Sequence, residues 1–268
     1  MNPLQKRLIF SAILIAISLY AIFLAPDGVF FLITVTLGLL ALNEFLMMAQ
    51  KKGILLQRPL GLVLAGVLFF SVYYDAEAVT LAMIFLAISV FNFSRPSREQ
   101  VLLSTAVTIF GIVYVGWFFS HLVKIKALEL GGRWVFYTLL IVKGGDAGAY
   151  FIGKRFGKVR LIEHVSPNKS VEGAIGGLAT SVILSLLSKI YLPSVAFYHF
   201  IVLGLLTGVL AQLGDLAESL IKRDVGVKDS GHVPGLGGIL DVLDSLLLSC
   251  PFIYYYITSF SHIALRFS

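Results

Sequence analysis

Apolar segments long enough to cross a membrane recur along the whole chain. A membrane-spanning helix needs about 20 predominantly apolar residues, and the 268-residue sequence contains nine candidate segments. They lie at 8–25, 29–49, 59–74, 77–93, 102–123, 134–152, 171–192, 195–221 and 236–260. The third and fourth are short, and the sixth, eighth and ninth carry charges. The pattern predicts an all-α, polytopic integral membrane protein with about nine transmembrane helices.

The composition excludes a soluble globular domain. Hydrophobic residues make up 58% of the chain and charged residues only 13%, about half the charged fraction of soluble domains. The single cysteine, Cys250, lies in an apolar run and cannot form an internal disulfide. The net charge of +6 is modest. Because Lys and Arg of a membrane protein usually set its topology, this charge does not indicate nucleic-acid binding.

Basic residues gather in alternate connections between the apolar segments. They precede the first segment at Lys6 and Arg7, and they follow the sixth and eighth segments. The positive-inside rule therefore places the N-terminus in the cytoplasm and the C-terminus outside, with the two most polar loops on the cytoplasmic side. Two features are contrary to this orientation, the connection 124–133 and Arg266.

Acidic residues are concentrated near the C-terminal end, between apolar segments. Six of the 15 Asp and Glu residues lie within 215–244. They are Asp215, Glu218, Asp224, Asp229, Asp241 and Asp244. A carboxylate in hydrocarbon is costly unless it pairs, binds a metal or faces water. The concentration therefore predicts that the protein holds cations at the membrane boundary.

Two polar stripes follow from the spacing of these residues on helices. The first contains Asp215, Glu218, Ser219 and Lys222, and the second contains Asp241, Asp244 and Ser245. Residues three, four and seven positions apart share one helix face. Two such stripes could form a carboxylate cage for a hard cation such as Mg²⁺, which prefers oxygen ligands. Pairing of the acids with Lys222 and Arg223 is the alternative, and spacing does not decide between them.

A glycine-rich segment, GVKDSGHVPGLGGILD at 226–241, separates the two stripes. A glycine-rich turn that opens a helix can offer backbone N–H groups to phosphate. An ordinary re-entrant turn is the alternative. The segment matches neither a P-loop nor a GxGxxG motif after a strand, so no soluble nucleotide-binding fold is implied.

A second polar block occupies residues 143–177. Lys143 and Asp146 interrupt an apolar segment, and small residues around Asp146 allow a ligand or another helix to approach. A basic cluster follows, either as a phosphate contact or as a topological anchor: Lys154, Arg155, Lys158 and Arg160. The stretch 166–173 opens the next helix, with Ser170 or Asn168 as its cap, and its Lys169 and Glu172 are candidates for a specific contact.

Taken together, the two blocks resemble the phosphatidate cytidylyltransferases, also called CDP-diacylglycerol synthases. The family's C-terminal pattern corresponds here to Ser219-x-x-Lys222-Arg223, Lys228-Asp229, Pro234-Gly-Leu236-Gly-Gly238 and Asp241-Val242-Leu-Asp244. Its earlier elements correspond to Asp146–Tyr150 and Ser166–Gly173. The match runs in order over roughly residues 140–250, and upstream of it the resemblance is only in hydrophobicity.

The resemblance implies a membrane enzyme that joins CTP and phosphatidate to give CDP-diacylglycerol and pyrophosphate in phospholipid biosynthesis. It implies Mg²⁺ bound by Asp215 and Asp241, with Asp244 and Glu218 as support, and leaves a second, monovalent cation open. The catalytic residues would be Asp215, Asp241, Asp244 and Lys222. The substrate-binding residues would be Asp146, Lys169, Glu172, Ser219, Arg223, Lys228 and Asp229.

The expected partners are CTP, phosphatidate and the lipid bilayer, without nucleic acid, and a homodimer is left open. The expected location is the cell (inner) membrane, with the active site facing the cytoplasm. Residues 1–130 would form N-terminal transmembrane helices, and 131–268 a C-terminal transmembrane catalytic region with cytoplasmic motif loops.

The chain departs from the family pattern at two positions and in one loop. Leu236 stands in place of the usual His, Val242 stands in place of the usual Arg, and the loop 229–234 is one residue short. The departures leave the carboxylates intact. Two rival functions remain: a CTP-dependent enzyme acting on another lipid, as a CDP-lipid synthase or a lipid kinase, and, less favoured, an ion-coupled transporter, since intramembrane acids and broken helices also mark transporters.

Overall fold

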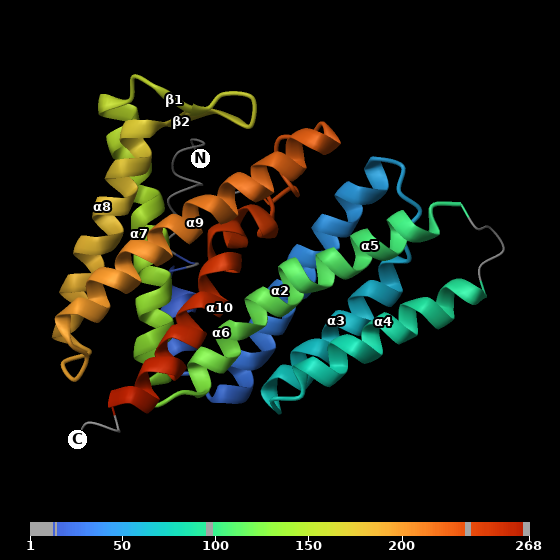
Figure 1. Ribbon diagram of the computed structural model, residues 1–268, viewed down its shortest axis with the longest axis horizontal. Coiled ribbons are helices and arrows are strands. Elements are labelled where there is room, and N and C mark those ends of the chain that lie inside the picture. The colour runs from blue at the N-terminus through green and yellow to red at the C-terminus, as the bar shows by residue number, and fades with distance from the viewer. Residues whose placement is uncertain (1–12, 14, 95–98, 234–236, 265–268) are drawn as a thin grey trace. The chain divides into compact units, whose positions relative to one another are not determined.

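The computed structural model describes residues 13, 15–94, 99–233 and 237–264. The chain forms two compact units, and each is described by itself. The first comprises Met1–Ala21, Ala25–Lys124 and Val225–Val242, and the second comprises Ile22–Leu24, Ile125–Asp224 and Leu243–Ser268. Both are built from helices, as the apolar segments predict (Figure 1).

The first unit contains the helices that follow the N-terminal segment. They are α2 (Asp27–Lys51), α3 (Arg58–Tyr73), α4 (Glu77–Phe93), α5 (Val101–Gly111), the π-helical turn η1 (Ile112–Trp117) and most of α6 (Phe118–Ala127). Helix α3 packs against α2 and η1 around the buried side chains of Leu42, Phe69 and Ile112. Gly38 makes room for the ring of Phe69, which a Cβ at position 38 would overlap.

The second unit contains the remaining helices and a small hairpin. They are α7 (Gly131–Phe156), β1 (Arg160–Ile162), β2 (Ser166–Ser170), α8 (Val171–Leu187), the 3₁₀ turn η2 (Ser188–Ile190) and α9 (Phe197–Val225), followed by α10 (Ile239–Ala264) from Leu243 onward. Small residues bring α7 and α8 close together (Figure 1). A Cβ on Gly177 would lie 2.8 Å from Cβ of Ala149 and 2.9 Å from the carbonyl oxygen of Gly145. Such seams allow the close backbone approach typical of membrane helices.

The hairpin was not expected from the sequence, which predicted that 166–173 opens a helix. Instead, Ser166–Ser170 pairs antiparallel with β1, and the helix begins at Val171. Pro167 explains part of the difference, because the residue before a proline is disfavoured in the α conformation. The predicted cap is confirmed at Ser170, whose Oγ accepts the N–H of Gly173 at 3.1 Å. An N-terminal cap of this kind satisfies one of the free N–H groups of the first helical turn.

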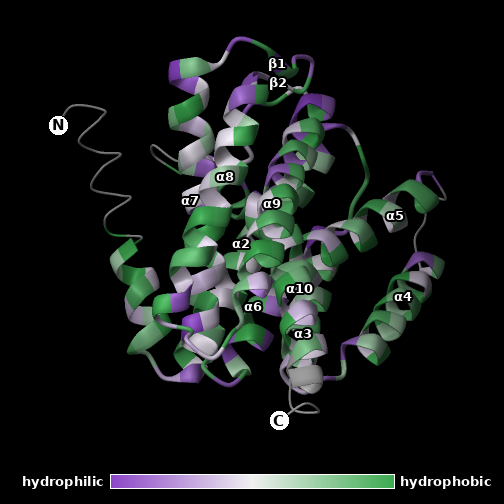
Figure 2. Cartoon of the chain, turned by 60° about the vertical axis from the view of Figure 1, so that its left-hand side comes forward, coloured by the Kyte–Doolittle hydropathy of each residue, from purple (hydrophilic) through white to green (hydrophobic). Residues whose placement is uncertain are grey.

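Six helices in the described part of the chain are long and apolar enough to cross a membrane. They are Asp27–Lys51, Val101–Ala127, Gly131–Phe156, Val171–Ile190, Phe197–Val225 and Ile239–Phe260. Helices α3 and α4 lie at the third and fourth predicted segments but have only 16 and 17 residues. In the first predicted segment, residues 15–23 are helical, while 8–12 and 14 lie outside the described residues. Figure 2 shows that the helices consist mainly of hydrophobic residues, and many of their large hydrophobic side chains are exposed, as expected for an integral membrane protein.

Candidate active site

A cavity of about 670 Å³ lies in the second unit, where the hairpin meets α7, α8 and α9. Its charged lining residues come from both polar blocks of the sequence. They are Asp146, Lys154, Arg160, Lys169 and Asp215. The cavity therefore brings together residues up to about 70 positions apart in the chain, and it combines carboxylates with cationic side chains.

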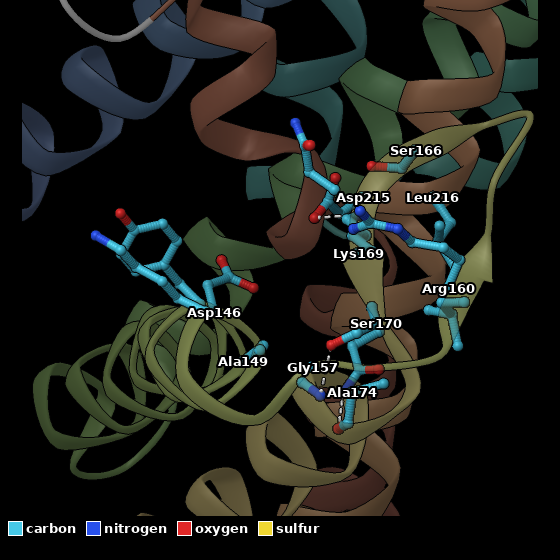
Figure 3. Close-up of a pocket in the computed structure, with 17 residues that line it drawn as sticks. Asp146, Ala149, Gly157, Arg160, Ser166, Lys169, Ser170, Ala174, Asp215 and Leu216 are labelled. Atoms are coloured by element: carbon cyan, nitrogen blue, oxygen red, sulfur yellow. Dashed lines mark hydrogen bonds and ion pairs between the residues drawn. The ribbon is translucent and has the colours of Figure 1, made fainter.

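Lys169 and Asp215 form an ion pair in the lining of the cavity (Figure 3). Lys169 Nζ, from β2, lies 2.6 Å from Asp215 Oδ2, on α9. Ser219 lies one turn along α9 and donates its hydroxyl to Asp215 Oδ1 at 3.4 Å. The sequence grouped Asp215 with Ser219 on one stripe, and the structure confirms that contact. The ion pair of Asp215 is with Lys169, whereas the sequence had suggested Lys222 or Arg223 as its partner.

Asp146 projects from α7 toward the same cavity, as Figure 3 shows. Its Oδ2 accepts the hydroxyl of Ser245 at 2.9 Å and lies 3.3 Å from Lys143 Nζ. Lys143 Nζ also donates to Ser245 Oγ at 2.7 Å. These contacts connect α7 to α10, so Lys143 and Asp146 hold two helices together, and Asp146 also lines the cavity.

Asp244 is a buried carboxylate near two others. Its residue is 7% exposed, and its charge interacts unfavourably with those of Asp215 and Asp146 and favourably with that of Lys143. Gly214, beside Asp215 on α9, lies against the backbone of Asp244, so a Cβ there would be 2.5 Å from the Asp244 carbonyl oxygen. Like charges near one another in apolar surroundings favour a bound cation.

Lys222 and Glu218 form a buried ion pair one helical turn apart on α9. Arg223 is exposed, and its Nε donates to the carbonyl oxygen of Val165 at 3.2 Å, which ties the hairpin to the end of α9. Neither Lys222 nor Arg223 belongs to the described lining of the cavity. The pairing alternative raised by the sequence therefore applies to Glu218 and Lys222.

Glu172 fixes the start of the hairpin. Its carboxylate accepts the backbone N–H of Lys158 at 3.0 Å and that of Val159 at 3.3 Å. Of the basic cluster after α7, Lys154 and Arg160 line the cavity, while Arg155 and Lys158 do not belong to its described lining. Glu172 is not in the described lining itself, but it binds the backbone between the lining residues Gly157 and Arg160.

The glycine-rich segment belongs to the first unit, where it precedes α10. Lys228 and Asp229 are exposed there. The backbone N–H of Gly238 is bound by Asp241 Oδ2 at 2.6 Å, and the N–H groups of Ile239 and Leu240 are bound by Glu44 of α2 at 3.0 and 2.9 Å. The amides that open α10 therefore bind carboxylates of the chain itself, and in this arrangement they do not form a phosphate cradle.

Leu236, one of the two departures from the family pattern, lies outside the described residues. Pro234 and Gly235 of the glycine-rich segment also lie outside them. Val242, the other departure, is half-buried on α10.

Among the described residues, no group of three or more His, Cys, Asp or Glu side chains is arranged to hold a metal ion by itself.

Glu44 and Ser230 were not singled out from the sequence. Glu44 is a lone acid inside the apolar segment 29–49, and such acids are functional candidates by default. That signal was available. Ser230 had no comparable signal, because a serine in a glycine-rich loop is ordinary, and only its contacts with Glu44 and Asp241 distinguish it.

These features define a class of protein: a helical integral membrane protein with a cavity lined by carboxylates and by Lys and Arg side chains. The chain belongs to the cytidylyltransferase family, whose profile matches residues 5–260. It is 32% identical to the phosphatidate cytidylyltransferase of Bacillus subtilis, over 96% of this chain and 99% of that protein.

Two further relatives carry the same name. The chain is 33% identical to the phosphatidate cytidylyltransferase of Staphylococcus saprophyticus, over 90% of this chain and 94% of the relative. It is 32% identical to that of Synechocystis, over 95% and 96% respectively. The similarity extends over nearly the full length of each protein, so it includes the N-terminal helices, where the motifs gave no information.

Proposed function

We propose that the protein transfers the cytidylyl group of CTP to phosphatidate, giving CDP-diacylglycerol and pyrophosphate. The observation that carries the proposal is the cavity of the second unit, where Asp146 and Asp215 lie among Lys154, Arg160 and Lys169. A triphosphate and a lipid phosphate both need cationic partners, and the relatives named above are phosphatidate cytidylyltransferases.

The reaction needs no covalent enzyme intermediate, because phosphatidate already carries a nucleophile. An oxygen of its phosphate attacks the α-phosphorus of CTP. The new P–O bond forms as the bond from the α-phosphorus to the bridging oxygen of the β-phosphate breaks, and pyrophosphate leaves with that electron pair. Negative charge accumulates at the reacting centre, so cations placed beforehand around the phosphates supply much of the catalysis.

The cationic residues are proposed to bind and orient the phosphates. Lys169 is proposed to exchange its contact with Asp215 for a substrate phosphate, because both residues line the cavity. Lys222, Arg223 and Lys228 are proposed to contact the triphosphate, with Ser219 and Asp229 as neighbouring polar contacts. Asp146 and Glu172 complete the cytoplasmic mouth, and Glu172 does so by holding the backbone of Lys158 and Val159.

Mg²⁺ is the proposed cofactor, with Asp215 and Asp241 each as a ligand and Asp244 and Glu218 as support. When bound, Mg²⁺ neutralises charge on the triphosphate and on the leaving pyrophosphate. The donors fit this ion, since they are carboxylate oxygens. Mg²⁺ is usually bound by one or two carboxylates together with substrate phosphates, so the proposed site needs few ligands from the chain itself. A second, monovalent cation is compatible with the remaining acids.

The proposed topology has nine transmembrane helices, a cytoplasmic N-terminus and the cavity on the cytoplasmic side of the cell (inner) membrane. The distribution of basic residues supports this orientation. The cavity lies at the end of the second unit that carries Lys154, Arg155, Lys158 and Arg160. CTP is cytoplasmic, so this orientation gives the enzyme access to its substrate.

The direct test is to incubate the purified protein with CTP labelled on the α-phosphate, phosphatidate and Mg²⁺, and to identify the lipid product. Labelled CDP-diacylglycerol, abolished by EDTA and restored by Mg²⁺, is the expected result. Unlabelled lipid with labelled CDP would identify a lipid kinase. Labelled product only with another phospholipid would identify a different CDP-lipid synthase. Absence of any CTP-dependent product with every lipid tested would favour the transporter.

A further inference from the structure

Glu44 lies on α2, inside an otherwise apolar helix, and it is bonded to a segment almost 200 residues further along the chain. Its carboxylate oxygens accept the N–H of Ile239 at 3.0 Å and that of Leu240 at 2.9 Å. The first N–H groups of a helix have no partner within the helix, and the helix dipole makes that end positive. Glu44 therefore supplies both the hydrogen-bond acceptors and the negative charge that the start of α10 requires.

The same carboxylate is connected to Asp241 through one hydroxyl group. Ser230 Oγ lies 2.8 Å from Glu44 Oε2 and 2.9 Å from Asp241 Oδ2. Asp241 Oδ2 also accepts the N–H of Ser230 at 2.8 Å and that of Gly238 at 2.6 Å. A serine hydroxyl carries one hydrogen, which the two carboxylate oxygens share or accept in turn, while its oxygen accepts the N–H of Asp241 at 3.3 Å. Ser230 therefore contacts both carboxylates.

The glycines of the loop leave space for this arrangement and for nothing larger. A Cβ on Gly231 would overlap the carboxylate of Glu44, and a Cβ on Gly238 would overlap both Glu44 Oε2 and Ser230 Oγ. Gly237 has φ +86°, a left-handed conformation that favours glycine, and a Cβ there would lie 2.7 Å from Asp241 Oδ2. The backbone around Asp241 is therefore closed tightly over the Glu44 side chain.

We propose that Glu44 is a positioning residue for the cytidylyl transfer. It holds the first turn of α10 and, through Ser230, the side chain of Asp241 in the orientation in which Asp241 is proposed to bind Mg²⁺. The inference rests on the proposed function, in which Asp241 is a metal ligand. Residues that orient a metal ligand typically cost about 10- to 100-fold in metal affinity or activity when they are replaced.

The test compares Glu44→Gln with Glu77→Gln in the full-length protein. Glu77 is a matched control: it is a partly buried acid of the same unit, paired with Lys124 at 2.6 Å and remote in sequence from the α10 loop. Three quantities are measured for each variant: the Mg²⁺ concentration for half-maximal activity, the amide hydrogen exchange of 228–242 without metal, and the melting temperature in detergent.

Glu44→Gln should raise the half-maximal Mg²⁺ concentration by about 10-fold or more and accelerate exchange at 238–240, with a smaller effect on the KM for CTP. Glu77→Gln should leave the Mg²⁺ dependence and the exchange unchanged, even if its melting temperature falls. Equal Mg²⁺ dependence in the two variants, or unchanged exchange at 238–240 in Glu44→Gln, would overturn the proposal.

Ser230→Ala is a second test of the connection between Glu44 and Asp241, because it removes the hydroxyl with a change small enough to preserve the fold. It should raise the half-maximal Mg²⁺ concentration in the same direction but by less, since Asp241 keeps its two backbone contacts. The double variant with Glu44→Gln should be no worse than Glu44→Gln alone, because both act through one connection. If the two substitutions changed the half-maximal Mg²⁺ concentration additively, Glu44 and Ser230 would not act through the same contact with Asp241.

Asp241→Asn separates failure of this inference from failure of the proposed function. If Asp241→Asn keeps wild-type activity and Mg²⁺ dependence, the metal assignment is wrong, and the inference about Glu44 falls with it. If Asp241→Asn is inactive while Glu44→Gln matches the wild type in Mg²⁺ dependence, only the positioning role is wrong.

Discussion

Two lysines near the candidate site, Lys169 and Lys222, form ion pairs that differ in how deeply they are buried. Lys169 and Asp215 have side chains 28% and 31% exposed, whereas those of Lys222 and Glu218 are 10% and 1% exposed. A partly exposed pair contributes little net stability and exchanges partners easily. Breaking a buried pair leaves a charge without compensation and costs about 3–5 kcal/mol.

Replacing Lys169 or Lys222 with methionine should therefore have different effects on CTP binding and on thermal stability. Lys169→Met should raise the KM for CTP and lower the melting temperature less than Lys222→Met does, because the Lys169–Asp215 pair is the less buried of the two. Lys222→Met should lower both activity and stability, the latter by about 3–5 kcal/mol. Thermal melting in detergent together with CTP titrations measures the two effects. A stable Lys222→Met variant would show that its pair with Glu218 is not structurally important.

Asp215→Asn and Asp241→Asn should each reduce activity by more than about 100-fold, the upper end of what residues around a metal ligand contribute. The amide keeps the shape of the side chain but loses the charge that a cation needs. Asp224→Asn is the control, because Asp224 is an exposed acid on the same helix as Asp215. Turnover is measured at limiting Mg²⁺, and near-normal turnover in either ligand variant would refute that assignment.

At the residue scale, sequence reasoning identified candidates whose partners share a helix or a motif. Ser219 beside Asp215 follows from helical spacing alone. The pair of Lys169 with Asp215 does not, because 46 residues and a change of element separate them, and neither spacing nor composition reports which surfaces meet. The partners of Glu44 could not be predicted for the same reason, although its position as a lone acid in an apolar segment was a local signal.

At the scale of elements, the hairpin and α8 depend on a small number of polar contacts. Ser170 caps α8, and Glu172 in its first turn binds the backbone just before β1, at Lys158 and Val159. The sequence predicted the cap because serine before a helix is a local signal. It missed the hairpin because β1 and β2 are too short to show alternation, and the contact from Glu172 to Lys158 is not local.

Ser170→Ala should destabilise the start of α8 by about 1 kcal/mol, the usual cost of losing a cap. The change removes the acceptor for the N–H of Gly173 and leaves the packing otherwise intact. Hydrogen exchange at 171–174 and the melting temperature measure the effect. Ser166→Ala on the same strand is the control and should be neutral. Unchanged exchange in Ser170→Ala would show that water replaces the cap.

Gly177→Val should separate α7 from α8, because the added side chain would meet Ala149 and the backbone of Gly145. Overpacking of this kind typically costs about 1–3 kcal/mol. Activity should fall as well, since α7 carries Asp146 and β2, directly before α8, carries Lys169. Ile175→Ala, on the exposed side of α8, should leave both quantities near wild type. A normal melting temperature in Gly177→Val would contradict the close approach.

At the scale of the whole molecule, the apolar segments were sufficient to predict a helical membrane protein. They could not predict the two compact units. The chain passes from one unit to the other near residues 21–25, 124, 224 and 242, whereas the sequence suggested a functional division at 130. That division stays a prediction about function. Composition changes along a sequence reveal consecutive domains, but they do not reveal units assembled from separated segments.

The proposed sidedness can be tested with single cysteines at Asn168 and His232. Both residues are exposed, whereas Ser230 is buried and bonded to two acids, so it is unsuitable for labelling. In a Cys250→Ser background, each cysteine should react with an impermeant thiol reagent only from the cytoplasmic side. A cysteine replacing Asp27, in a connection assigned to the opposite side, is the control. Labelling of positions 168 or 232 in intact cells would reverse the topology.

The bonds of Glu44 also have a consequence for how the protein is made. Its partners Ile239 and Leu240 are synthesised 195 and 196 residues later. At a translation rate of about 5–20 residues per second, α2 would leave the ribosome many seconds before its carboxylate could acquire these contacts. During that interval the acid needs water, a proton or a temporary partner, because an uncompensated carboxylate is costly in hydrocarbon. During biogenesis, therefore, Glu44 lacks its native hydrogen-bond donors until the start of α10 has been synthesised.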